Sequence, residues 1–141
     1  MKLRSIAATF MAGAFLAALA PGAQANPKGC SNATLKGTYE SLLSGTVNGV
    51  PFAALDLVTA DGNGNITASG TIVDNGTVIP TTFTATYTVN SDCTGTFSSS
   101  SGTTENVELL LDGSEVRIIV TSTALGPATV TGLAKRWTTS N

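Results

Sequence analysis

Two tight-turn sequences and the alternating segment that follows them constrain the fold of this chain most strongly. The turns are Asp61–Asn65 (DGNGN) and Asp74–Gly76 (DNG), and Asn and Gly readily adopt the positive φ that hairpin turns need. The next segment, Thr77–Asn90, reads TVIPTTFTATYTVN, and its apolar residues share one parity: Ile79, Phe83, Ala85, Tyr87 and Val89. A period of two predicts a strand with one buried face, and so many Thr and aromatic residues disfavour a helix.

The same criteria predict eight strands in the chain. They cover residues 35–43, 51–59, 66–73, 77–90, 93–98, 107–111, 116–123 and 129–137. Short turns join them, so we expect an all-β, single-domain antiparallel β-barrel of about eight strands, in which closure removes exposed strand edges. A β-sandwich of the immunoglobulin type is the alternative. It usually buries a Trp between paired cysteines, whereas Trp137 lies near the carboxyl end.

The first 25 residues have the pattern of a secretory signal peptide. Lys2 and Arg4 form its basic region, residues 6–20 its apolar region, and Ala23-Gln24-Ala25 a small-residue cleavage site. We therefore expect the barrel domain to span residues 26–141 and the protein to be secreted or periplasmic. The apolar run is too short for a membrane span, and no later run is longer, so no transmembrane segment is expected in the mature chain.

Cys30 and Cys93 are the only two cysteines. Exported proteins enter an oxidising compartment, so we expect these two residues to form a disulfide. A reactive free cysteine is the alternative, but the chain has no His to activate it.

The charge balance argues against nucleic acid as a partner. Removal of the signal peptide leaves five basic residues against nine acidic ones, and the basic residues form no stripe. Binding to a phosphate backbone requires clustered Lys and Arg.

The motifs of hydrolases and metal sites are missing or incomplete. Without His, a Ser-His-Asp or Cys-His relay cannot form. Asp61, Asn63 and Asn65 resemble the start of a calcium loop, but Ile66 and Ile72 stand where that loop needs Gly and Glu. We therefore expect turn chemistry at Asp61 and assign no catalytic residue, no metal and no cofactor.

Two acids, Glu40 and Asp56, lie inside predicted strands. If either pointed into the barrel, burial would raise its pKa, and Arg117 or Arg136 could pair with it. We expect both to face solvent, because an inward Asp56 would turn its larger neighbours Leu55 and Leu57 outward.

Two aromatic residues complete the set of candidate binding residues. Tyr39 and Tyr87 have strand spacing, which is most typical of a core, but each phenol could also contact a ligand. The predicted binding residues are therefore Tyr39, Tyr87, Glu40, Asp56 and Arg117.

Several segments resemble a group of small secreted bacterial proteins without an assigned activity. They are CSNATLKGTY (30–39), NGVPFAA (48–54), DGNGN (61–65), NGTVIPTTFTATYTVN (75–90), DCTG (92–95) and AKRW (134–137). In size and strand count the chain is also similar to the calycin-like barrels, both lipocalin-like and allene oxide cyclase-like. This second likeness concerns the fold and transfers no catalytic residue.

Three functions are compatible with these observations. The first is a non-catalytic protein that binds a small apolar or amphipathic molecule in the barrel mouth. The second is an isomerase or cyclase of the allene oxide cyclase type, with Glu40 or Asp56 as the acid–base group beside Tyr39 or Tyr87. The third is a structural or surface-associated protein with a filled barrel. An open apolar pocket favours the first, an open pocket with a buried carboxylate the second, and a closed core the third. The oligomeric state stays open.

The signal-peptide pattern makes a direct prediction. Amino-terminal sequencing of the exported protein should begin at Asn26. A soluble exported protein that still carries Met1–Ala25 would contradict it.

Overall fold

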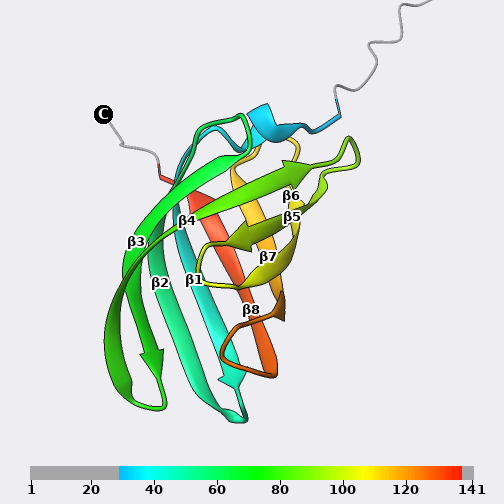
Figure 1. The fold of residues 1–141 in the computed structure, drawn as a ribbon. Helices are drawn as coiled ribbons and strands as arrows, with labels where there is room; N and C mark the ends of the chain where they lie inside the picture. Colours follow the sequence, from blue (N-terminus) through cyan, green and yellow to red (C-terminus); the bar gives the residue numbers. More distant parts are fainter. Residues whose placement is uncertain (1–28, 138–141) are drawn as a thin grey trace, which may run out of the picture.

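The computed structural model describes residues 29–137, so the predicted signal peptide lies outside the described residues. Eight antiparallel strands form a closed barrel in which each strand pairs with the next and β8 pairs with β1 (Figure 1). The predicted eight-stranded barrel is confirmed, and the alternative of a sandwich is wrong. The strands are β1 (Gly37–Val47), β2 (Val50–Ala60), β3 (Asn65–Asp74), β4 (Thr77–Val89), β5 (Thr94–Ser99), β6 (Thr104–Leu109), β7 (Glu115–Ser122) and β8 (Ala128–Arg136).

The predicted and observed strands differ most in β1 and β6. The first strand was expected to end at Leu43 but continues to Val47. Leu35 was expected to begin the first strand, but it ends a short 3-10 helix, η1 (Asn32–Leu35). The sixth strand was expected over residues 107–111 and instead covers Thr104–Leu109. The reason is the turn that follows it, in which the Asp112 carboxylate accepts hydrogen bonds from the backbone and hydroxyl of Ser114. This turn draws residues 110–111 out of the strand.

Side chains alternate between the barrel interior and solvent along the strands, as the period of two predicted. On β4, Ala85, Tyr87 and Val89 are buried and the Thr residues between them are exposed. Ile79 was expected on the buried face but is 39% exposed. It lies near the β3–β4 hairpin, which projects beyond the barrel at the end opposite η1 (Figure 1, green).

The short helix η1 lies across one end of the barrel (Figure 1). Leu35, only 2% exposed, packs into the main core cluster. Asn32 ties the helix to β4: its side-chain Oδ1 accepts a hydrogen bond from the Val89 N–H at 2.8 Å, and its carbonyl accepts one from the Tyr87 hydroxyl at 3.0 Å. We refer to this end as the closed end.

A disulfide joins Cys30 to Cys93 at the closed end, as predicted, with the two Cα atoms 4.9 Å apart. It links the segment before η1 to the turn between β4 and β5. The Cys30 N–H also donates to the Ser91 carbonyl at 3.2 Å. Within residues 29–137, no helix has the length and apolar character to cross a membrane.

The sequence separation of 63 between the cysteines leads to a stability prediction. Replacing both by Ser should lower the free energy of unfolding by about 4 kcal/mol, because the unfolded chain regains the entropy of an open loop. Urea denaturation of the oxidised protein and of the C30S/C93S variant measures the difference. Equal midpoints with equal slopes would show that the disulfide does not stabilise the barrel.

Candidate functional site

The end of the barrel opposite η1 leads into a pocket of about 510 Å³, which we call the open pocket. Its walls are mainly apolar and include Phe52, Ile72, Phe83, Val120 and Val130. Loop residues at that end of the barrel also line it, namely Ser101, Thr123, Ala124 and Leu125.

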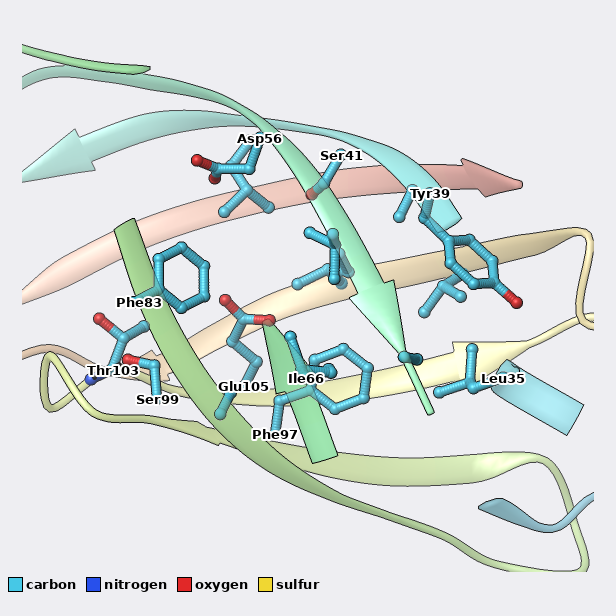
Figure 2. A pocket seen from close by; sticks show the side chains of 17 residues that line it. Leu35, Tyr39, Ser41, Asp56, Ile66, Phe83, Phe97, Ser99, Thr103 and Glu105 are labelled. Atoms are coloured by element: carbon cyan, nitrogen blue, oxygen red, sulfur yellow. Dashed lines mark hydrogen bonds between the residues drawn. The ribbon is translucent and has the colours of Figure 1, made fainter. Parts of the chain in front are cut away.

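A deeper cavity of about 60 Å³ lies on the closed-end side of the open pocket. Figure 2 shows its lining, with Leu35 and Tyr39 toward the closed end and Asp56, Phe83 and Glu105 away from it. The two spaces share six lining residues, which therefore form the floor of the open pocket: Leu43, Asp56, Phe83, Ser99, Thr103 and Glu105.

Asp56 belongs to a row of small residues that crosses four strands on the inner face of the barrel. On the inner face, Ser41 of β1 pairs with Asp56 of β2, which pairs with Gly70 of β3, which in turn pairs with Thr81 of β4. A Cβ atom at Gly70 would overlap the Asp56 Oδ1 atom and the Leu55 carbonyl oxygen. The missing side chain at Gly70 therefore provides the space for the carboxyl group.

The expectation that Asp56 faces solvent is wrong. Asp56 is only 6% exposed, whereas Leu55 and Leu57 are 50% and 46% exposed on the outer face. The strand register decides this, because Asp56 shares its face with the buried Ala54 and Ala60. Large apolar residues are common on protein surfaces, so side-chain size did not identify the inner face.

The Asp56 carboxyl group has one hydrogen-bond donor among the described residues. The Thr81 hydroxyl donates to Oδ1 at 3.4 Å, a long hydrogen bond. Burial raises the pKa of Asp56, and the hydrogen bond from Thr81 lowers it by less.

Glu105, on β6, brings a second carboxyl group to the floor of the open pocket. Strands β2 and β6 are four apart in the closed order of eight, so Glu105 and Asp56 enter from opposite walls (Figure 2). Burial, and to a lesser extent the negative charge of Asp56, raise the pKa of Glu105 to about 7. Within residues 29–137 its carboxylate forms no ion pair.

Sequence reasoning missed Glu105 because the sixth strand was predicted to start at Val107. The signal was present: Glu105 has the parity of the buried Val107 and Leu109, so a strand extended by two residues would have turned it inward. An irregularity in the pairing of β6 with β7 between Thr104 and Glu105 marks the place where the pattern is interrupted.

The other predicted binding residues lie away from the open pocket. Glu40 is exposed, as expected. Arg117 also points outward, with 69% of its side chain exposed and its Nε 3.7 Å from Glu115 Oε1. The prediction that Arg117 could pair with an inward acid is therefore not supported by its position.

The two tyrosine hydroxyl groups serve the closed end. Tyr39 donates to the Gly113 carbonyl at 2.8 Å and accepts from Arg136 Nη2 at 3.0 Å. Tyr39 lines the deeper cavity, and Tyr87 bonds to Asn32 as described above. Of the five predicted binding residues, only Asp56 lines the open pocket.

The Asp61 segment is a turn stabilised by its own side chain. Asp61 Oδ1 accepts hydrogen bonds from the N–H groups of Asn63 and Asn65 at 2.7 and 3.0 Å, and Oδ2 accepts one from Asn65 Nδ2 at 2.7 Å. These bonds to the side chain and backbone of Asn65 lower the pKa of Asp61 to about 2. In the part of the chain that the structure describes, no three His, Cys, Asp or Glu side chains are grouped so that they could hold a metal ion.

The carboxyl pair can hold or transfer a proton near neutral pH, or it can bind a positively charged group. Both possibilities follow from the elevated pKa of Glu105, because a carboxyl group that titrates near pH 7 exists in both forms under ordinary conditions.

The raised pKa predicts how stability depends on pH. Between its ordinary value of 4.5 and about 7, Glu105 holds its proton more tightly in the folded protein than in the unfolded chain. The free energy of unfolding should therefore fall as the pH rises through this range, by about 3 kcal/mol from Glu105.

The Glu105→Gln variant should lose most of this pH dependence. Glu108→Gln, on the exposed face of the same strand, is the matched control and should retain it. Chemical denaturation at pH 4.5, 6 and 8 measures the effect. An unchanged slope in E105Q would assign the pH dependence to other groups.

The chain matches no model of a known protein family, no curated protein sequence and no solved structure. The resemblances noted in the sequence therefore stay predictions.

Proposed function

We propose that the protein is an exported barrel that binds one small amphipathic molecule in its open pocket without transforming it. The observation that supports this most directly is the open pocket itself, with about 510 Å³ of space, apolar walls and two carboxyl groups on its floor. This volume is within the range of roughly 300–1,000 Å³ that is typical of small-molecule sites. A purely structural barrel has no need for such a space, since side chains can fill an eight-stranded barrel.

The distribution of polar groups suggests how a ligand lies. Its apolar body would pack against the walls, where Phe52, Phe83 and Val120 contribute side chains, and its polar end would reach Asp56 and Glu105. Burial of the apolar body would supply most of the binding free energy, and the carboxyl groups would set the orientation.

Export is supported by two independent observations. The disulfide between Cys30 and Cys93 is typical of proteins that fold in an oxidising compartment, and the first 25 residues have the pattern of a signal peptide.

The second candidate function is an isomerase or cyclase, and the buried carboxyl pair is the observation that favours it. A carboxyl group with a pKa near 7 suits general acid–base catalysis. Such a site was expected to have an aromatic or Arg side chain beside the acid. The predicted partners do not fill this role, because Tyr39 and Tyr87 direct their hydroxyl groups to the closed end and Arg117 is exposed. We therefore rank binding ahead of catalysis.

Filling the open pocket should abolish binding. Ala54, 4% exposed, lines the pocket, while its neighbour Ala53 belongs to the opposite face of β2. Ala54→Phe should weaken binding of the neutral fluorescent probe N-phenyl-1-naphthylamine at least tenfold, whereas the matched control Ala53→Phe should leave it unchanged. Fluorescence titration measures the affinity, and circular dichroism shows whether each variant is folded.

If Ala54→Phe does not fold, Ile72→Trp, which also lines the pocket, serves the same purpose. Equal binding by the wild type and by a folded pocket-filling variant would place the probe elsewhere and contradict the proposal. Native mass spectrometry of protein from its own host should in addition reveal a bound small molecule.

A further inference from the structure

We infer that the open pocket selects ligands with a positively charged nitrogen at one end of an apolar body, and that Asp56 and Glu105 bind this nitrogen from opposite walls. This inference rests on the proposed binding function and specifies its ligand class. It assigns the two acids a shared role as the counter-charge for the ligand.

The charged side chains at the floor of the open pocket are both acidic. Among residues 29–137, Asp56 and Glu105 are the only acidic or basic side chains that line the open pocket. A ligand with a carboxylate would bring a third negative group to a floor that is already acidic. A cation would instead neutralise a charge that is costly to bury alone.

The basic residues within residues 29–137 lie away from the two acids. None of them lines either space. Lys36, Lys135 and Arg117 are exposed, and the Arg136 guanidinium is held at the closed end by the Tyr39 hydroxyl and the Thr34 carbonyl. The described chain therefore supplies no cation to the two acids, and a ligand can.

The two carboxyl groups can accept further hydrogen bonds from a ligand. Asp56 is only 6% exposed, and among the described residues its carboxyl group accepts a single long hydrogen bond, from Thr81. Burial and the charge of Asp56 raise the pKa of Glu105, and no hydrogen bond from the part of the chain that the structure describes lowers it. An ammonium group carries three N–H donors and could satisfy acceptors on both walls at once.

The groups that face the pair determine how binding depends on pH. Toward the closed end, the deeper cavity adds the Tyr39 phenol, and beyond it lies Arg136. Toward the open end, Asp74 ends β3 near the rim. Because an alkylammonium ion stays protonated up to about pH 10, as Lys does, the titration of Glu105, whose pKa burial raises to about 7, dominates near neutrality. Affinity for an amine should therefore rise between pH 5 and pH 8.

Three probes with one apolar chain and different end groups test the inference: decylamine, decanol and decanoate. Isothermal titration calorimetry on the full mature protein at pH 7.5, below the concentration at which each probe aggregates, compares their affinities. We expect the amine to bind at least about tenfold more tightly than the alcohol, and the carboxylate to bind most weakly. At pH 5 the advantage of the amine over the alcohol should shrink.

Variants separate the role of the charge from that of the pocket. Glu105→Gln and Asp56→Asn should each lower the affinity for decylamine about tenfold or more. The loss for decanol should be much smaller, because an amide can still hydrogen-bond a hydroxyl group but carries no charge. Glu108→Gln, outside the barrel, should change neither. If Asp56→Asn does not fold, Glu105→Gln alone decides.

The outcomes distinguish this inference from the proposed function. If decanol binds as tightly as decylamine, or if E105Q retains full affinity for the amine, the inference is wrong while the binding function stands. If none of the three probes binds, both are wrong. Preference for decanoate would also overturn the inference, because it would require a positive pocket.

Discussion

The pairing of β8 with β1 is the contact on which the rest of the structure depends. It runs from the Tyr39–Arg136 pair to the Val47–Ala128 pair and converts a meander of hairpins into a closed barrel. Closure gives every strand an inner and an outer face and pairs each strand with two neighbours. The backbones approach so closely along this seam that a Cβ atom at Gly132 would overlap the Leu42 carbonyl oxygen.

The inward-facing side chains are large near the closed end of the barrel and small across its middle. Toward the closed end, the space is filled by Leu35, Tyr39, Tyr87 and Val116. The disulfide holds the segment that precedes η1 against this end. Across the middle of β1 to β4, the inner row consists of Ser41, Asp56, Gly70 and Thr81, which occupy little volume. A barrel of eight strands can be just filled or can hold one ligand, and this row of small residues provides the space beside the acids.

The carboxyl pair shows why a candidate functional site need not be a stable arrangement. Two acids in apolar surroundings destabilise the folded protein when both are ionised, and burial accordingly raises the pKa of each. Buried polar groups without full hydrogen bonding are rare in stable cores and concentrate at functional sites. The disulfide and the packing at the closed end can offset this local loss of folding stability.

The sequence by itself determined the all-β class, the eight strands, the turns and the cysteine pair. These features depend on local properties: Asn-Gly and Asp-Gly turn conformations, alternation along each strand, and the presence of only two thiols. Only the tertiary structure decided which face of β2 points inward. Judged from the local sequence alone, the larger and more apolar Leu55 and Leu57 would face inward. The register that pairs Asp56 with Ser41 and Gly70 instead places Asp56 inside. Likewise, Glu105 became part of the site because β6 lies across the barrel from β2, a relation that exists only after closure.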